Sequence, residues 1–386
     1  MKLREVKTKQ DDLEFIRLPD RICKNDKNYI PALRQDIRKI FDPKQNKLFR
    51  EGVAIRWILE DDKGEIIGRV AAFIHPKTSK SFKQPTGGMG FFDSIDNKDA
   101  AFMLFDACKN WLAERGMQAM DGPINFGEKD RFWGLLVENF TDPPTYAMNY
   151  NPPYYQKFFE EYGFKLYYKQ LVYSRRMRDP AQEIFQRKDA MLKTDPRFRV
   201  GNVRGMSLDE MANNFMIVYN GAWAGSDGFK SMSLMQSKLI FKSMKQVIDP
   251  DIIVFVYYDD APIGFWVNIP ELNQIFKHVH GNLNLWGKLL FLWHKKRHTS
   301  RIMYGLVFGV VREMQGRGVE ALMVKYGEDV IVPLNRFDDT VITWVGDFNP
   351  RMIKICESLG ARNYRNYITY RYLFDRNAVY ERSPLR

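Results

Sequence analysis

Cysteine and histidine are scarce in this chain of 386 residues, which contains three cysteines and five histidines. Cys23, Cys108 and Cys356 are odd in number and far apart, so they form neither a disulfide framework nor a CxxC metal pair. Such sparing use of cysteine fits a reducing compartment best. His294 and His298 have the spacing of a metal pair on a helix, but no HExxH glutamate lies between them and no third ligand stands out. The sequence therefore predicts no disulfide and no metal.

Long hydrophobic runs are also lacking. The longest, such as "LLFLW" at 289–293, fall far short of the roughly 18 residues that a membrane span needs. The N-terminal stretch "MKLREVKTKQDD" is charged and has no apolar region of the secretory type. Aromatic RNA-binding motifs and a long Lys/Arg tail are missing as well. We therefore expect a soluble cytoplasmic protein with no membrane span and no nucleic-acid partner.

The composition is that of a globular protein, with 45% hydrophobic, 27% charged and 14% aromatic residues. The length predicts two or three domains. The net charge of +12 favours anionic partners, such as a membrane surface, an acidic carrier protein or a phosphate-bearing cofactor.

Two patterns occur twice along the chain. Residues 57–74 and 252–269 each predict a β-hairpin whose second strand begins with Ile-Gly, and these glycines are 196 residues apart (264 − 68). Asn151 and Asn349 each precede a proline and an amphipathic helix that ends at a glycine, and they are 198 residues apart (349 − 151). The matching offsets indicate a duplicated unit of just under 200 residues.

Each unit also predicts a strand, a helix and a strand between these markers. A polar helix bounded by prolines near 177–197 joins the units. We therefore predict an α+β protein with a first lobe at 1–176, a linker helix at 177–197 and a second lobe at 198–386.

A glycine turn connects a predicted strand to a predicted helix at Gln315-Gly316-Arg317-Gly318-Val319. The first amides of a helix lack partners and attract anions together with the helix dipole. Glycine lets a phosphate approach the backbone, and Arg317 adds a positive charge. The turn is thus a candidate pyrophosphate cradle, although its spacing fits neither a Walker A loop nor GxGxxG. The alternative is a glycine turn without a ligand.

The order of hairpin, strand, Q-x-x-G turn, helix, strand and Asn-capped helix resembles the GNAT superfamily of acyl-CoA N-acyltransferases. That family's cradle is [QR]-x-x-G-x-[GA]; Gln315 and Gly318 match it, while Glu320 replaces the final small residue. The stretches at 218–229, 269–274 and 349–373 resemble a bacterial two-lobed, tandem GNAT-like branch. The resemblance implies two GNAT-like lobes, each a mixed, mostly antiparallel twisted sheet flanked by helices.

The resemblance also implies acetyl-CoA or another acyl-CoA as co-substrate, with the backbone of the strand before the turn pairing with its pantetheine. The amide of Val310 would polarise the thioester carbonyl. Asn349 would line the thioester end, and Cys356 stands where the family often has a tyrosine that protonates the leaving thiolate. The implied donor site consists of Val310, Val311, Gln315, Gly316, Arg317, Gly318, Val319, Asn349 and Cys356.

The acceptor side is expected at the first helix of the second lobe and at the ends of two strands. Either of two acids there would relay a proton from an amine if burial raised its pKa. Core packing and ordinary surface carboxylates are the alternatives. The predicted substrate-binding residues are Tyr219, Asn220 and Trp223, and the predicted catalytic residues are Asp347, Asn349 and Glu271.

The first lobe has Asn97-Lys98-Asp99-Ala100 where the second has its glycine turn. Asp99 is expected to cap the helix and to repel a phosphate, so we predict one donor site, in the second lobe. The insertion at 273–300 contains an apolar stretch followed by a basic run. Contact with a membrane, a lid over an acyl chain and docking of an acyl carrier protein are alternatives there. The expectation is a helix packed on the sheet with a solvated basic end.

These observations predict an acyl-CoA-dependent N-acyltransferase, with acetyl as the expected acyl group and a small-molecule or peptide amine as acceptor. The amine attacks the thioester directly in a ternary complex. Two alternatives remain: a tRNA-dependent aminoacyltransferase of tandem GNAT type, and a catalytically silent module that binds acyl-CoA or a protein.

Overall fold

The computed structural model describes residues 1–80, 82–223 and 230–384. The first half contains β1 (Lys2–Glu5), α1 (Lys9–Ile22), α2 (Arg34–Phe41), β2 (Val53–Glu60), β3 (Ile66–Ile74), α3 (Pro76–Ser79), β4 (Thr86–Ser94), α4 (Lys98–Ala113), β5 (Ala119–Gly122), β6 (Leu135–Leu136), α5 (Tyr155–Tyr162) and β7 (Lys165–Arg176). The remainder contains α6 (Glu183–Leu192), β8 (Phe198–Asn202), α7 (Leu208–Trp223), α8 (Leu234–Met244), β9 (Ile253–Tyr258), β10 (Ala261–Pro270), α9 (Asn273–Phe276), α10 (Leu285–Lys296), β11 (Ile302–Val310), α11 (Val319–Tyr326), β12 (Asp339–Gly346), α12 (Pro350–Ser358) and β13 (Arg362–Leu373).

The internal repeat predicted from the sequence is present in the order of elements. The series β2, β3, β4, α4, β5, α5, β7 recurs as β9, β10, β11, α11, β12, α12, β13. In each half the pair formed by the third and fourth strands of the series, β4–β5 and β11–β12, is parallel, and the other pairs of the series are antiparallel. The predicted α+β fold with mixed, mostly antiparallel sheets flanked by helices is confirmed.

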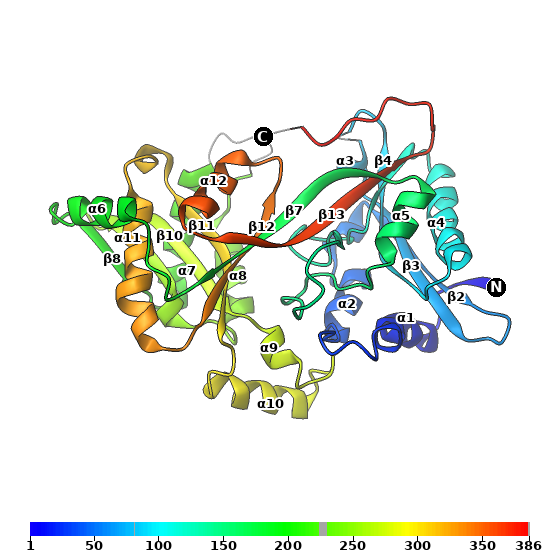
Figure 1. Cartoon of the computed structure of the whole chain (residues 1–386), viewed down its shortest axis with the longest axis horizontal. Coiled ribbons are helices and arrows are strands. Elements are labelled where there is room, and N and C mark those ends of the chain that lie inside the picture. Colours follow the sequence, from blue (N-terminus) through cyan, green and yellow to red (C-terminus); the bar gives the residue numbers. More distant parts are fainter. Residues whose placement is uncertain (81, 224–229, 385–386) are drawn as a thin grey trace.

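The last strand of each half lies in the sheet of the other half. β13 pairs with β5, and β7 pairs with β12, while β7 and β13 also pair with each other in antiparallel fashion. The result is one continuous sheet in the order β1-β2-β3-β4-β5-β13-β7-β12-β11-β10-β9-β8. Figure 1 shows β7 and β13 crossing the middle of the molecule between the halves. The division at 176 and 198 stays a prediction, and the sheet itself has no break there.

The helix starts follow the predicted caps only in part. Asn349 caps α12, because its side-chain oxygen accepts from the Met352 amide at 3.1 Å. Asn151 does not cap α5; it exchanges hydrogen bonds with the backbone of Leu136 at 2.9 and 3.2 Å, and the helix begins later, at Tyr155. In α4 the cap is Asn97 rather than Asp99. These two expectations were wrong. In α4 the sequence does not show which of two nearby polar residues adopts the extended cap conformation, and in α5 the Asn151 side chain is bonded to the distant Leu136.

The insertion at 273–300 forms α9 and α10, and α10 does not pack on the sheet as expected. Only Gly287, Phe291 and His294 of this helix are buried. Phe291 stacks on Phe276 with ring centroids 5.6 Å apart, and the His294 ring stacks on His278 at 4.0 Å. The helix is therefore fixed by a narrow stripe, and most of its apolar side chains remain outside the core.

Candidate active site

A cleft opens where β11 and β12 separate. The two strands pair only from Ile302–Gly305 to 339–342. Beyond this point β11 continues along β10 up to Val310, and β12 continues along β7. Since neither strand pairs with the other there, the two strands form the sides of a wedge-shaped gap in the middle of the second half.

The cleft has a volume of about 290 Å³ and a mostly apolar lining. Aromatic side chains come from four elements: Trp223 from α7, Trp266 from β10, Phe308 from β11 and Trp344 from β12. Aliphatic and thioether side chains complete the wall, namely Met177, Leu306, Val307, Val324, Ile342, Val345, Met352 and Leu359. The polar or charged side chains that reach the lining are Arg175, Glu328, Thr340, Thr343 and Asn349.

The open edge of β11 presents backbone groups to the gap. The Val311 amide donates to Ile263 O of the preceding chain segment at 2.9 Å. Because hydrogen-bonding directions alternate along an antiparallel pair, the N–H of Val310 points away from β10 and toward the side that β12 has left. The carbonyl of Val310 accepts from Nε2 of Gln315 at 2.9 Å, which ties the glycine turn to the strand end.

The glycine turn has the conformation that only glycine adopts readily. Gly316 and Gly318 have φ of 77° and 89°, and the position of a Cβ at Gly316 would meet open space. α11 starts directly afterwards at the buried Val319. Among the described residues, the N–H groups of Gly316 and Gly318 have no hydrogen-bond partner. The turn therefore offers main-chain donors at the start of a helix.

Lys188 of α6 lies beside this turn and was not predicted from the sequence. Its side chain packs against Gly318, where a Cβ would lie 2.9 Å from Lys188 Cδ. Its Nζ is 3.1 Å from Oε1 of Glu320. The carboxylate that departs from the family cradle is thus paired with a cation at the same corner. No spacing rule could have revealed this contact, because the two residues are 132 positions apart.

Two of the predicted residues reach the cleft with their side chains, Trp223 and Asn349. Trp223 lies against β11, since a Cβ at Gly309 would be only 2.9 Å from its ring. Tyr219 lies one turn earlier, with its ring 5.0 Å from that of Trp223. Asn220 points elsewhere and exchanges two hydrogen bonds with the backbone of Met232, at 2.8 and 2.9 Å. Residues 224–229 of the family-like stretch at 218–229 lie outside the described residues.

The predicted acids do not line the cleft. Arg382 donates to Asp347 at the turn after β12. Glu271 is 3% exposed and accepts from the amides of Tyr146, Asn273 and Gln274 at 2.7 to 3.0 Å. Burial raises the pKa of Glu271 to about 7, and the three amide donors oppose that rise. Its contacts tie the loop of the first half to the end of β10.

Cys356 is fully buried on α12, in a cluster with Tyr173, Val345 and Ala361. Burial raises the pKa of its thiol to about 12. The thiol is therefore placed as a core side chain and does not line the cleft.

No family model matches the chain. The chain is 30% identical over 377 residues to the bacterial ceramide synthase of Caulobacter vibrioides, and the match covers 95% of each chain. The chain belongs to the family of this ceramide synthase. The chain is also 25% identical over 378 residues to protein YghO of Escherichia coli, and the match covers 95% of this chain and 94% of YghO.

Two solved structures share the fold of this chain over nearly its whole length. A tandem GNAT protein from the clavulanic acid pathway matches with a TM-score of 0.53 at 9% identity, over 98% of this chain and 99% of its own. A GCN5-related N-acetyltransferase from Sphaerobacter thermophilus matches with a TM-score of 0.51 at 11% identity, over 99% and 98%. The predicted resemblance to two-lobed GNAT proteins is confirmed.

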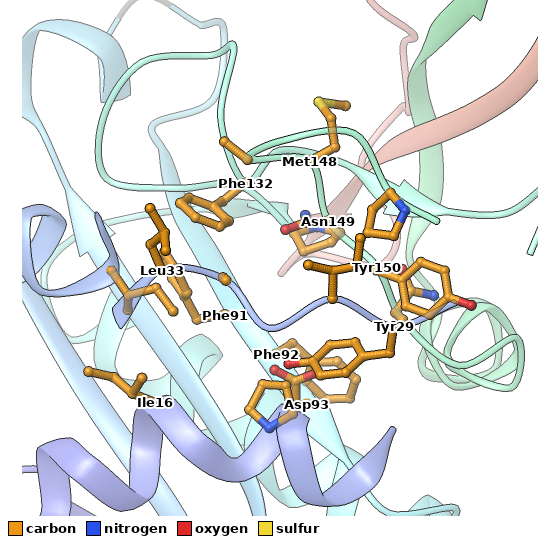
Figure 2. Close-up of a pocket in the computed structure, with 18 of the residues that line it drawn as sticks. Ile16, Tyr29, Leu33, Phe91, Phe92, Asp93, Phe132, Met148, Asn149 and Tyr150 are labelled. Carbon is orange, nitrogen blue, oxygen red and sulfur yellow. The ribbon is translucent and has the colours of Figure 1, made fainter. Parts of the chain in front are cut away.

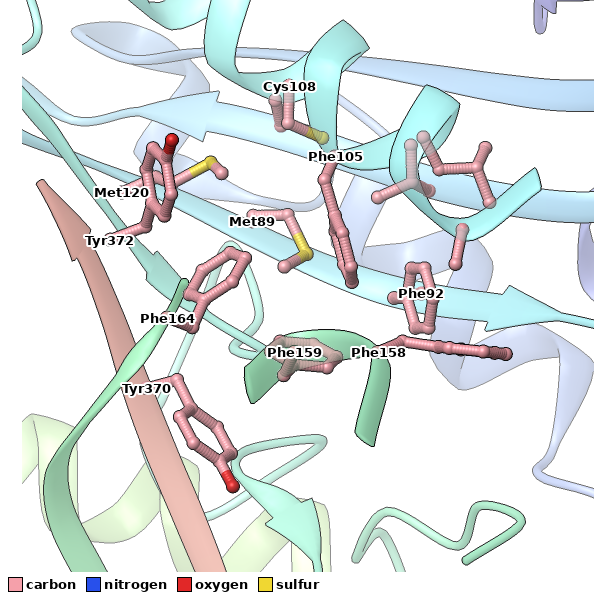
Figure 3. Close-up of a cluster of buried hydrophobic side chains, with 14 of the residues drawn as sticks. Met89, Phe92, Phe105, Cys108, Met120, Phe158, Phe159, Phe164, Tyr370 and Tyr372 are labelled. Carbon is pink, nitrogen blue, oxygen red and sulfur yellow. The ribbon is translucent and has the colours of Figure 1, made fainter. Parts of the chain in front are cut away.

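In the first GNAT lobe the described chain closes the gap between β4 and β5 that corresponds to the one between β11 and β12. The chain after β5 closes against β4: the Ile124 amide donates to Met89 O at 2.8 Å, and a Cβ at Gly90 would collide with Ile124 O. Aromatic side chains fill the space below, as Figure 3 shows, with Phe92 and Phe105 stacked at 4.6 Å and Phe159 4.9 Å from Phe105.

A smaller cavity of about 80 Å³ lies in the first GNAT lobe, beside α1 and the loop at 144–151 (Figure 2). Its acidic group, Asp93, is already neutralised by Nε of Arg69 at 2.7 Å and accepts from Tyr155. Burial raises the pKa of Asp93, and Arg69 opposes the rise. This cavity is too small for a second acyl donor.

Two hydroxyl groups of the cleft in the second GNAT lobe were missed in the sequence. Oγ1 of Thr343 donates to the hydroxyl of the buried Tyr304 at 2.7 Å. Oγ1 of Thr340 is buried and has no partner among the described residues. Both lie on β12, whose sequence "DTVITWVG" predicts a strand but does not indicate that these hydroxyls face a cleft.

Proposed function

We propose that this protein is an acyl-CoA-dependent N-acyltransferase that places a long acyl chain on the amino group of a long-chain amino alcohol. The proposal is supported by membership of a family that includes a bacterial ceramide synthase, because a ceramide is the amide of a fatty acid with such a base. The tandem GNAT fold supports acyl-CoA as the donor.

The observation that supports a long acyl chain is the apolar cleft between β11 and β12. The cleft has a volume of about 290 Å³. A group the size of a water molecule takes up ~30 Å³, so the cleft has room for about ten such groups. An acetyl group alone would contact little of this apolar lining. Burial of methylenes against Trp266, Ile342 and Trp344 instead contributes about 0.8 kcal/mol each. We therefore propose that the enzyme prefers acyl chains longer than the acetyl group expected from the sequence.

The residues of the chain act mainly by positioning. The N–H of Val310 is directed into the gap and would polarise the thioester carbonyl as negative charge develops on its oxygen. Asn349, at the mouth of the cleft, would hold the thioester end. The amine then attacks the carbonyl carbon directly, the carbon–sulfur bond breaks, and the thiolate leaves as coenzyme A. Holding both reactants in one cleft supplies most of the rate enhancement.

The donor's diphosphate would bind at the glycine turn. The free amides of Gly316 and Gly318 and the dipole of α11 attract an anion. Lys188 and Arg317 add positive charge, and Lys188 also offsets the carboxylate of Glu320. Asp347 remains the proposed acceptor of the amine proton, acting through water.

The direct test measures coenzyme A release by the purified protein with acyl-CoAs from acetyl to palmitoyl and with sphinganine, a short amine and no amine. We expect turnover with sphinganine and a long-chain acyl-CoA, and product mass should equal that of the N-acyl amide. Turnover only with acetyl-CoA would overturn the assignment of chain length. No turnover with any pair would overturn the acyltransferase proposal.

One observation favours a second candidate, a silent module that binds acyl-CoA. The residue that occupies the family's proton-donor position, Cys356, is buried away from the cleft. Calorimetric binding of palmitoyl-CoA without turnover on any amine would select this candidate. Turnover with the amide as product would exclude it.

A further inference from the structure

The surface of α10 is apolar to an unusual degree for a helix that faces solvent. Its large exposed side chains are Leu285, Trp286, Leu289, Leu290, Leu292 and Trp293, with exposed fractions from 41% to 74%. At about 100° per residue, they cover one broad side of the helix, between the buried stripe and the side that carries Lys288 and Lys295. In Figure 1 this helix lies at the lower edge of the molecule, away from the sheet. A contiguous apolar patch of this kind marks an interaction surface.

The helix is held rigidly in this exposed position. The Asn284 side chain caps it by accepting from the Gly287 amide at 2.9 Å. Gly287 itself is required, because a Cβ there would lie 2.2 Å from Asn282 O. Nζ of Lys295 donates to Gln246 O at 2.6 Å, beyond the end of α8. The apolar side chains are therefore displayed by a fixed element and are not the result of a loosely attached segment.

The segments that carry the patch contain charged residues of one sign only, although Lys238 of α8 pairs with Asp209 of α7. From 272 to 300 the sequence has five basic residues and no aspartate or glutamate. Neighbouring α8 continues the pattern, since residues 230–248 contain four lysines and no acid. α8 also exposes Leu234, Met235, Leu239 and Ile240. The five basic residues of the first segment are Lys277, Lys288, Lys295, Lys296 and Arg297.

We propose that α10 is a docking helix for an anionic lipid bilayer, which it enters from one side without crossing it. Among the described residues no helix is long and apolar enough to cross a membrane. A short helix with Trp and Leu outward and Lys and Arg alongside is the composition that lies in the bilayer interface. Tryptophan suits the headgroup level, and the lysines attract anionic headgroups.

An acidic carrier protein is the competing partner, and the shape of the patch argues against it. A protein that binds a helix covers one stripe of it and leaves the far side polar. Here the apolar side chains follow one another at 289, 290, 292 and 293 and cover a side of the helix that is broader than one stripe. A bilayer interface buries such a broad apolar side in full.

The test is co-sedimentation of the full chain with vesicles of phosphatidylcholine alone or of phosphatidylcholine mixed with anionic phosphatidylglycerol. We expect binding to the mixed vesicles at low salt, weakening as salt rises because the lysines are screened. The double variant Trp286→Glu/Leu289→Glu should lose at least about tenfold in affinity. Lys288→Gln should lose about fivefold, the effect typical of one lysine near an anionic surface.

The matched control is Met191→Glu/Val379→Glu, which changes exposed apolar residues on other elements, at 59% and 74% exposure. It should bind vesicles as the unaltered protein does. Thermal melting of every variant shows that it is folded. The proposal is overturned if the unaltered protein stays in the supernatant with anionic vesicles. It is also overturned if the Trp286 double variant binds these vesicles as well as the unaltered protein does. These measurements use no substrate, so they are independent of the acyl transfer proposed above.

Discussion

Nζ of Lys188 lies 3.1 Å from Oε1 of Glu320, and the two residues join the linker helix α6 to the first turn of α11. The carboxylate therefore faces a cation at the very corner where the diphosphate of an acyl-CoA would bind. This pair would allow the proposed cradle to contain an acid in place of a small residue.

Lys188→Met should weaken acyl-CoA binding, because Glu320 would then repel the diphosphate without compensation. Both side chains are about 30% exposed, so we expect a modest two- to fivefold rise in KM for the donor, equivalent to roughly 0.5–1 kcal/mol. The double variant Lys188→Met/Glu320→Ala should recover most of the loss. A rise in KM that the second change does not reverse would show that Lys188 acts on the donor and not on Glu320.

Ile342→Trp should shorten the acyl chain that the enzyme accepts. Ile342 lines the cleft from β12, and a larger ring there removes space that a long chain needs. We expect kcat/KM with palmitoyl-CoA to fall by at least about tenfold relative to that with a short acyl-CoA. Ile184→Trp, at a residue of α6 that is 39% exposed, is the matched control. Equal loss with all chain lengths would place the acyl chain elsewhere.

Glu271 should make stability depend on pH. Its pKa is raised from 4.5 to about 7 in the folded protein, so between these values the unfolded chain has released a proton that the folded one retains. The contribution of Glu271 to the free energy of unfolding is therefore largest below about pH 4.5. It falls as the pH rises to about 7, by on the order of 3 kcal/mol.

In Glu271→Gln this pH dependence should disappear, while the lost acceptor for one amide costs about 1 kcal/mol. Melting temperatures of both proteins at pH 5 and pH 7.5 would check the prediction. If Glu271 were instead the catalytic base, the variant would lose activity at an unchanged melting temperature.

The three cysteines should be unreactive in the native protein. All are buried, and burial raises the pKa of Cys23 and Cys356 to about 12 and that of Cys108 well above its ordinary value. A thiol reagent should label none until denaturant is added, and Cys356→Ala should retain activity. Rapid labelling of Cys356 in the folded state, blocked by acyl-CoA, would place that thiol in the cleft after all.

Much of the fold could be predicted from local patterns. The hairpins at 57–74 and 252–269, the linker helix and the Asn349 cap each follow from residues close in sequence. The pairing of β13 with β5 could not be predicted, because no residue of a strand specifies which of two similar sheet edges it joins. The same holds for the closure of the first lobe by Ile124.

The site was predictable where it depends on backbone, as at Gly316 and Gly318, which need positive φ whatever surrounds them. It was not predictable where it depends on contacts between distant segments. Lys188 approaches Glu320 only because α6 packs on α11. One of the amides that donate to Glu271 belongs to Tyr146, in a loop of the first half. The apolar lining of the cleft, on which the proposed acyl-chain length rests, also arises from several distant elements together.

The crossing of β7 and β13 constrains how the chain can fold during its synthesis. While the ribosome is still adding residues 177–361, the N-terminal lobe has a gap beside β5 that only residues 362–373 fill. Neither lobe can be completed alone, so a chain that stops short of its last strand leaves both sheets open, including the one made first.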